Sequence, residues 1–252
     1  MDEHLMSGTA ELPGTVSVAA DPAGVAAAAA DWLLDLAGDA ITRSGRFAIA
    51  LAGGSTPRSL YSLLATAPRR ERTDWARWEF FFGDERACPP DDPGSNYRMA
   101  REALLDHVPV AAGRVHRMEG EREDLDLAAA DYAAVLAATC ASGAAGDAPR
   151  LDAVLLGLGE NGHTASLFPG DPVLEVTDRW AARARADYAP FDRITLTFPV
   201  LNAARNVAFL VTGAAKGDAL RGVAAGTVPA ARVRPAEGDL RWFLDTAAAA
   251  SI

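Results

Sequence analysis

Chemistry is suggested first by a glycine-rich turn that carries a histidine. Residues 151–156 form a short, mostly apolar run that predicts a buried strand. Gly157, Gly159 and Gly162 predict a turn after it, and we expect His163 in the first turn of a following helix. Side chains at such a turn face the crevice beyond the carboxyl end of the strand, where open α/β sheets bind ligands. The pattern therefore indicates an active site with His163 as a candidate base.

Two other interpretations of this turn stay open. Its glycines satisfy the G-x-G-x-x-G pattern of dinucleotide-binding turns, although Pro169 and Gly170 would end the next helix soon after it begins. A lone histidine can also be a hydrogen-bonded structural residue. We favour ligand binding over both, because a glycine-rich strand-to-helix turn leaves backbone N–H groups free.

A second glycine turn has the features of an anion site. Residues 47–51 predict a strand, and Gly53 and Gly54 follow it directly before Ser55 and Thr56. Glycines let backbone N–H groups approach a ligand, and the hydroxyls add donors beside the positive end of the next helix. No lysine follows the glycines, so the turn is not a P-loop. We favour phosphate binding over the alternative in which Ser55 or Thr56 only caps the helix.

Charged residues that could contact a polar substrate follow other strands. Asp84 and Arg86 come directly after the strand expected at 78–82, and the Arg86 guanidinium can clamp a phosphate with two hydrogen bonds. Lys216 is the only lysine among 24 basic residues. In a chain so biased toward arginine, a retained lysine indicates a position that needs a compact ammonium group, with survival by chance as an equal alternative.

Strand and helix patterns alternate along the chain, and they define the elements that must position these residues. Strands are expected at 15–19, 47–51, 78–82, 115–118, 151–156, 194–198, 206–212 and 242–245. Helices are expected at 25–37, from 55 onward, at 96–108, at 125–140 and after 213. Such alternation predicts an α/β fold, a mostly parallel sheet with helices on both faces, plus a few antiparallel strands. We expect a loose tail at 1–13 and a single domain at 14–252.

Composition narrows the class of protein. With 252 residues, half of them hydrophobic, the chain can bury a full core. A formal net charge of −10 argues against nucleic acid as a partner, since that needs a basic face. No apolar run is long enough to span a membrane, and the first residues lack the pattern of a signal peptide. Cys88 and Cys140 stand apart without metal-ligand spacing, so we expect a cytoplasmic protein with no metal site.

Several ordered motifs resemble the 6-phosphogluconolactonase family over nearly the whole chain. They are Leu-Ala-Gly-Gly-Ser-Thr-Pro at 51–57, Gly-Asp-Glu-Arg at 83–86, the segment 95–105, Gly-Leu-Gly-Glu-Asn-Gly-His-Thr-Ala-Ser-Leu-Phe-Pro-Gly at 157–170, and Val-Thr-Gly-Ala-Ala-Lys at 211–216. The resemblance implies a Rossmann-like three-layer fold and hydrolysis of 6-phospho-D-glucono-1,5-lactone in the oxidative pentose phosphate pathway. It implies a phosphosugar lactone as the small-molecule partner and no organic cofactor. Apart from the resemblance, we expect no membrane association and a monomer or weak homodimer.

The resemblance also assigns roles to the residues found above. His163 would be the general base that prepares water, kept neutral at pH 7 by a helix N-terminus. The phosphate and the sugar oxygens would be bound by the turn after residues 47–51, by the charged residues after 78–82 and by the single lysine: Gly53, Gly54, Ser55, Thr56, Asp84, Arg86 and Lys216.

One position departs from the family pattern. The family usually has Asp two residues before the histidine, whereas this chain has Asn161. An amide oxygen can orient the imidazole N–H but supplies no charge. We therefore predict that Asn161→Asp preserves or raises activity.

Two other functions stay open from the sequence. The first is a glucosamine-6-phosphate deaminase/isomerase, which would need an acid a few residues after the histidine, where Ala165 to Phe168 offer none. The second is a sugar-phosphate-binding module without catalysis. Acid release from fresh lactone, or ammonia release from an amino sugar phosphate, would separate these functions.

Overall fold

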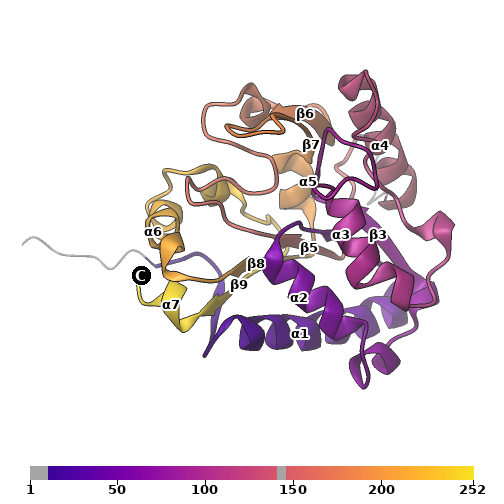
Figure 1. The fold of residues 1–252 in the computed structure, drawn as a ribbon, viewed down its shortest axis with the longest axis horizontal. Helices are drawn as coiled ribbons and strands as arrows, with labels where there is room; N and C mark the ends of the chain where they lie inside the picture. The colour runs from indigo at the N-terminus through magenta and orange to yellow at the C-terminus, as the bar shows by residue number, and fades with distance from the viewer. Residues whose placement is uncertain (1–10, 141–145) are drawn as a thin grey trace, which may run out of the picture.

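A six-stranded parallel sheet forms the centre of the molecule (Figure 1). The computed structural model describes residues 11–140 and 146–252. The strands follow the order β1-β9-β8-β5-β2-β3, and their neighbours pair in parallel. They are β1 (Thr15–Ala19), β2 (Phe47–Leu51), β3 (Trp78–Phe82), β5 (Ala153–Leu156), β8 (Asn206–Val211) and β9 (Asp239–Asp245). The predicted mostly parallel sheet is confirmed.

Helices cover both faces of this sheet, which confirms the predicted three layers. In β2, Ile49 and Leu51 pack with the helices of one face and Ala48 and Ala50 with those of the other, because successive side chains of a strand alternate. The first face carries α1 (Pro22–Ser44), α2 (Ser55–Leu64) and α3 (Asn96–Ala103). The second carries α4 (Leu125–Cys140), α5 (Phe198–Ala203), α6 (Gly217–Ala224) and the short α7 (Thr246–Ala249).

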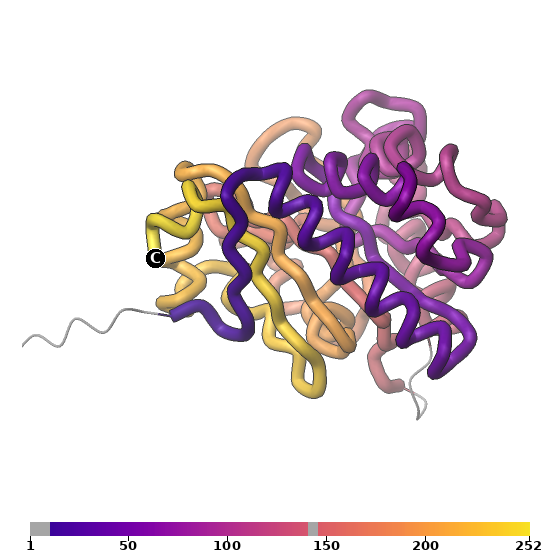
Figure 2. Tube along the Cα trace, turned by 90° about the horizontal axis from the view of Figure 1, so that it is seen from below, coloured from indigo at the N-terminus to yellow at the C-terminus, as the bar shows by residue number. Residues whose placement is uncertain are grey.

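The first and the last strand of the chain, β1 and β9, pair at one edge of the sheet. Figure 2 shows the indigo strand β1 beside the yellow strand β9, with α1 crossing the sheet next to them. Residues 1–10 of the predicted tail lie outside the described residues. Leu12 is buried, and the Pro13 carbonyl accepts a 2.8 Å hydrogen bond from the Trp242 indole, so the described end of the tail packs on the body of the protein.

A single residue separates the end of β3 from the start of a second, antiparallel sheet. It consists of β4 (Asp84–Arg86), β7 (Asp192–Leu196) and β6 (Ala181–Arg185), in the order β4-β7-β6. β7 confirms the antiparallel strand predicted near residue 194, whereas β6 lies in a stretch with no strand prediction. The β6–β7 hairpin lies beside α4 at the top of Figure 1, and residues 186–191 form its loop.

Some local predictions are wrong. The structure describes all of residues 157–170, and they form no helix, because Pro169 and the glycines favour turns. His163 therefore does not lie in the first turn of a helix. The strand predicted at 115–118 is reduced to one bridge between Val115 and Phe80. The helix expected after 213, with Lys216 in its first turn, begins only at Gly217, and Lys216 ends a 3₁₀ turn directly before it.

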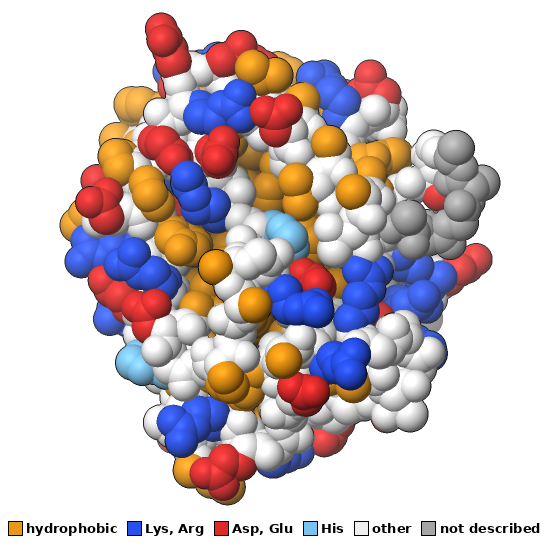
Figure 3. Space-filling model, turned by 90° about the vertical axis from the view of Figure 1, so that its right-hand side faces the viewer, with side chains coloured by type: hydrophobic (Ala, Val, Ile, Leu, Met, Phe, Trp, Pro, Cys, Tyr) orange, Lys and Arg blue, Asp and Glu red, His pale blue; other side chains and the backbone are white. Residues whose placement is uncertain are grey.

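The described ranges contain no helix that combines the length and the apolar character needed to cross a membrane. Figure 3 shows basic and acidic side chains interspersed over one face of the molecule. With both signs mixed, an anionic ligand on this face depends on a local group of donors and cations.

Candidate active site

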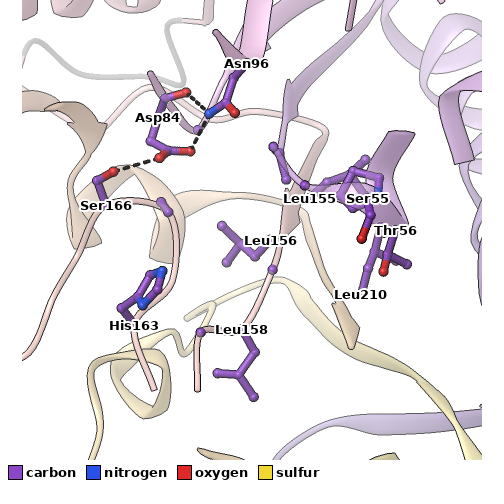
Figure 4. Close-up of a pocket in the computed structure, with 18 of the residues that line it drawn as sticks. Ser55, Thr56, Asp84, Asn96, Leu155, Leu156, Leu158, His163, Ser166 and Leu210 are labelled. Carbon is purple, nitrogen blue, oxygen red and sulfur yellow. Dashed lines mark hydrogen bonds between the residues drawn. The ribbon is translucent and has the colours of Figure 1, made fainter. Parts of the chain in front are cut away.

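A cavity of about 340 Å³ lies at the carboxyl ends of β8, β5, β2 and β3, which are neighbours in the large sheet. Its volume is within the range of small-molecule sites. In Figure 4, His163 and Asp84 lie on one side of the cavity and Ser55 and Thr56 on the other. The cavity brings together every predicted site residue except Asn161: Gly53, Gly54, Ser55, Thr56, Asp84, Arg86, His163 and Lys216.

The turn after β2 needs both of its glycines for steric reasons. A side chain at Gly53 would place its Cβ only 2.0 Å from Asn96 Oδ1. Gly54 has a φ of +104°, a conformation that other residues rarely adopt. The first glycine therefore admits a neighbouring side chain, and the second turns the backbone into α2.

No side chain caps the start of α2. Gly54 holds the N-cap position, so the predicted cap by Ser55 or Thr56 is wrong. The Thr56 hydroxyl lies 3.0 Å from the Thr212 hydroxyl, which joins the turns after β2 and β8. The positive end of α2 thus faces the cavity without a side-chain acceptor, which suits an anion.

The loop after β5 is shaped around the imidazole of His163. The Gly159 N–H donates to the His163 carbonyl over 2.8 Å, which closes the loop. A Cβ at Gly159 would lie 2.0 Å from His163 Nδ1, and a Cβ at Gly162 would lie 2.4 Å from Val228 Cβ. On its other side the ring stacks on Phe168, with 4.0 Å between ring centroids. Gly159 therefore makes room for the histidine ring, and Gly162 for the side chain of Val228.

A relay of hydrogen bonds fixes the tautomer of His163. Asn161 Nδ2 donates to the Asp187 carboxylate over 2.8 Å, which identifies the opposite end of the amide as the oxygen. That oxygen, Oδ1, lies 2.6 Å from His163 Nδ1 and accepts the His163 backbone N–H over 3.1 Å. Because an amide oxygen only accepts, Nδ1 carries the proton and Nε2 of the neutral ring is left as a base.

Burial keeps the imidazole neutral. It lowers the pKa of His163, and the nearby Lys216 and Arg193 lower that pKa further, while Asp84 and Asp187 oppose the shift. The predicted direction is the one found, but the predicted cause, a helix N-terminus, is wrong. An imidazole that remains unprotonated at neutral pH is suited to remove a proton from water.

Asp84 is buried at the edge of the cavity, and each of its carboxylate oxygens accepts one hydrogen bond from a neighbouring side chain. Its carboxylate accepts a 2.7 Å hydrogen bond from the Ser166 hydroxyl and a 3.1 Å bond from the Asn96 amide. Oδ1 of Asn96 is buried and has no partner within the described residues. The neighbouring Glu85 has a different role: it accepts the backbone N–H groups of Asn96 and Tyr97 at the start of α3.

Two arginines lie directly opposite each other on neighbouring strands of the small sheet. Arg86 in β4 pairs in register with Arg193 in β7, and like charges placed directly opposite are destabilising. Arg86 donates to the carbonyl of Gly94. Arg193 is 1% exposed, and its Nη1 is buried with no hydrogen-bond partner in the described part of the chain. Burial and the Arg86 charge lower the pKa of Arg193, while the nearby Asp84 opposes the shift.

Sequence reasoning missed several residues in and around the cavity. Arg193 stands at the start of an alternating strand, where its register against Arg86 could not be read from the chain. Tyr188 covers Arg193, with 5.3 Å between the guanidinium carbon and the ring centroid. Ser166 was visible inside the histidine motif, but its partner is a distant strand end. Asp187, in the β6–β7 loop, had no local signal.

A family model described as glucosamine-6-phosphate isomerases/6-phosphogluconolactonase matches residues 20–242. The chain belongs to this family. It is 41% identical to a 6-phosphogluconolactonase of Nostoc over 94% of this chain and 98% of the relative. It is 43% identical to a 6-phosphogluconolactonase of Synechocystis over 82% of this chain and 85% of the relative.

Solved structures of the glucosamine-6-phosphate isomerase/6-phosphogluconolactonase family share this fold. The 6-phosphogluconolactonase of Trypanosoma cruzi superposes with a TM-score of 0.84 at 30% identity, over 95% of this chain and 97% of that one. A monomeric glucosamine-6-phosphate deaminase superposes with a TM-score of 0.78 at 21% identity, over 94% of this chain and 100% of that one. The second likeness, at that identity, concerns the fold alone.

Proposed function

We propose that this chain hydrolyses 6-phospho-D-glucono-1,5-lactone to 6-phospho-D-gluconate, the lactone-opening step of the oxidative pentose phosphate pathway, with His163 as general base. One observation carries the proposal: the neutral imidazole of His163, its Nδ1 proton held by Asn161, shares one cavity with the buried, unpaired Nη1 of Arg193. Relatives named 6-phosphogluconolactonase support the same substrate.

The reaction needs a base close to the lactone carbonyl. Nε2 of His163 takes a proton from a water molecule as the water oxygen attacks the carbonyl carbon. The tetrahedral intermediate then collapses, the ring C–O bond breaks, and the imidazolium returns its proton to the leaving ring oxygen. Asn161 holds the Nδ1 proton throughout, so the ring presents the same nitrogen in both steps.

The phosphate group binds between the cations and the first turn of α2. Arg193 and Arg86 lie opposite each other, and an anion between them would remove their repulsion and give Arg193 Nη1 a partner. Lys216 and the turn Gly53–Thr56 line the same cavity and supply an ammonium group, backbone N–H groups and hydroxyls. Asp84 is the acceptor for sugar hydroxyls.

The reaction requires only proton transfer and charge stabilisation, so the proposal includes no metal and no organic cofactor. The substrate is a small phosphosugar lactone. The proposal involves no nucleic acid and no membrane, and it describes a monomer or weak homodimer.

Proton release from freshly prepared 6-phosphogluconolactone tests the function. The purified protein should release acid faster than a buffer blank, and His163→Ala should lose about 10²–10⁴-fold in kcat. Acid release at the blank rate would refute the function. Normal turnover by His163→Ala would remove His163 as the base, and ammonia release from glucosamine 6-phosphate would favour a deaminase.

A further inference from the structure

We infer that Asp187, in the loop of the β6–β7 hairpin, is a positioning residue that selects the orientation of the Asn161 amide and thereby the catalytic tautomer of His163. The inference rests on the proposed lactonase reaction. It assigns a function to a carboxylate that does not line the cavity and touches the base only through Asn161.

The argument begins with the ambiguity of an asparagine. An aspartate beside Nδ1 can only accept its proton, whereas an amide presents an acceptor at one end and a donor at the other. If the Nδ2 end of Asn161 faced the ring, Nδ1 would have to be the unprotonated nitrogen. The proton would then lie on Nε2, which could no longer act as the base. The reaction therefore depends on which end of the amide faces the imidazole.

Asp187 resolves this ambiguity because a carboxylate only accepts. Its Oδ2 lies 2.8 Å from Asn161 Nδ2, so the donor end of the amide is held away from the ring. The backbone N–H of His163, which donates to Asn161 Oδ1, favours the same orientation. Asp187 forms no ion pair within the described residues, although Arg183 on the same hairpin pairs with Asp192 over 2.7 Å. Within the described residues, the hydrogen bond from Asn161 Nδ2 is therefore the interaction that the Asp187 carboxylate makes.

The arrangement moves the negative charge one residue away from the imidazole. Asp187 and Asp84 raise the pKa of His163, while burial, Lys216 and Arg193 lower it. These groups, with the Tyr188 ring tilted at 53° and its centroid 6.4 Å away, are the charged and titratable groups that face the ring among the described residues. A carboxylate behind an amide still orients Nδ1–H but raises this pKa less than one in direct contact, because Coulomb energy falls with distance.

Two substitutions at Asp187 separate orientation from charge. Asp187→Ala removes the acceptor, and one lost hydrogen bond corresponds to a fall in kcat of about twofold to tenfold. KM should stay within about twofold, because Asp187 does not line the cavity. Asp187→Asn can still accept the Nδ2 proton, so its kcat at neutral pH should stay close to that of the wild type. The decline of its kcat at low pH should begin at a lower pH than in the wild type, because a charge that raises the pKa of His163 has been removed.

A second substitution, at Asn161, should restore the kcat that Asp187→Ala loses. Asn161→Asp in the Asp187→Ala background places an acceptor-only group beside Nδ1 and should restore kcat. It should also move the acid limb to higher pH, since the new charge contacts the ring directly. Asp192→Asn is the matched control: it removes a carboxylate from the same hairpin and breaks the ion pair with Arg183, and it should leave kcat and the pH profile unchanged.

Nitrogen NMR of the imidazole rings gives a readout that does not depend on turnover. The chain has four histidines, so the His163 signals can be assigned from its own substitution. The wild type should show the Nδ1–H tautomer, and Asp187→Ala a mixture of tautomers. Unchanged kcat, tautomer and pH profile in Asp187→Ala would overturn the inference, as would an equal loss in Asp192→Asn. A wild type without lactonase activity would refute the proposed function, while the tautomer measurement would still test the relay.

Discussion

Gly159→Ala should displace the catalytic base without unfolding the protein. Gly159 does not have a positive φ, so its backbone conformation is open to alanine. The added Cβ would lie 2.0 Å from Nδ1 and 2.1 Å from Cε1 of His163. The added methyl group therefore clashes with the ring of a side chain that can rotate away. We expect the substitution to change the position of the imidazole more than the stability of the fold.

The size of the effect follows from these distances. Non-bonded carbon atoms approach to about 3.5 Å, so the ring must move by roughly 1.5 Å. The Nδ1 to Asn161 Oδ1 contact of 2.6 Å would break, and Phe168, stacked 4.0 Å away, limits the ring on its other face. A misplacement of about 1 Å can reduce a rate by about 10²-fold. We expect kcat to fall by about that factor.

Initial rates of acid release, corrected for spontaneous lactone hydrolysis, measure the effect. Gly113→Ala is the control, because no heavy atom lies within 4 Å of its added methyl group and its φ is not positive. Both variants should melt close to the wild-type temperature. If Gly159→Ala melts normally and keeps its kcat within about threefold, against the 10²-fold expected for a displaced base, the imidazole is not the group that activates water.

Four further predictions concern charge. Because burial lowers the pKa of His163 below its usual value of about 6.5, kcat/KM should stay level as pH falls to 6.5 and decline only below it. The unfolded chain binds that proton first, so the free energy of unfolding should fall over the same acid range. The positive charges of Lys216 and Arg193 lower the pKa of His163, and a bound phosphate would offset them and raise that pKa in the enzyme–substrate complex. The fall of kcat in acid should therefore occur at higher pH than the fall of kcat/KM, which reports on the free enzyme. If both fall at the same pH, the phosphate does not bind beside these two cations. Arg193→Met should raise KM about tenfold or more with little change in kcat, and an unchanged KM would exclude Arg193 from substrate binding.

The sequence predicts the residues that follow the parallel strands, because hydrophobic runs and glycines locate strand ends locally. Strands β2, β3, β5 and β8 were each visible, and adjacent parallel strands bring their carboxyl ends to one edge. The α/β class, the cavity edge and the meeting of His163 with Ser55 and Thr56 all follow from that rule. What those residues do in the reaction remains a prediction.

The glycines were predicted as turn residues, but two of them have a different physical reason. Gly53 leaves space for the Asn96 amide, and Gly159 leaves space for the His163 ring. Neither requirement is visible in the spacing of the glycines, which is why a dinucleotide pattern remained an open alternative. The absence of a helix at 157–170 removes that alternative, since a dinucleotide site needs the N-terminus of a long helix there.

The contribution of the small sheet could not be read from the chain, because it depends on register between distant segments. Arg193 reaches the site only because β7 pairs with β4, and Asp187 only because β6 and β7 form a hairpin whose loop meets Asn161. The two sheets therefore contribute differently. In the proposed reaction, the parallel sheet supplies the base and the anion-binding turn, and the antiparallel sheet supplies a cation for the substrate and a carboxylate for the base. Arg86 and Arg193 repel each other and the nearby Asp84 opposes that effect only in part, so an anionic substrate bound between them would offset the remaining repulsion.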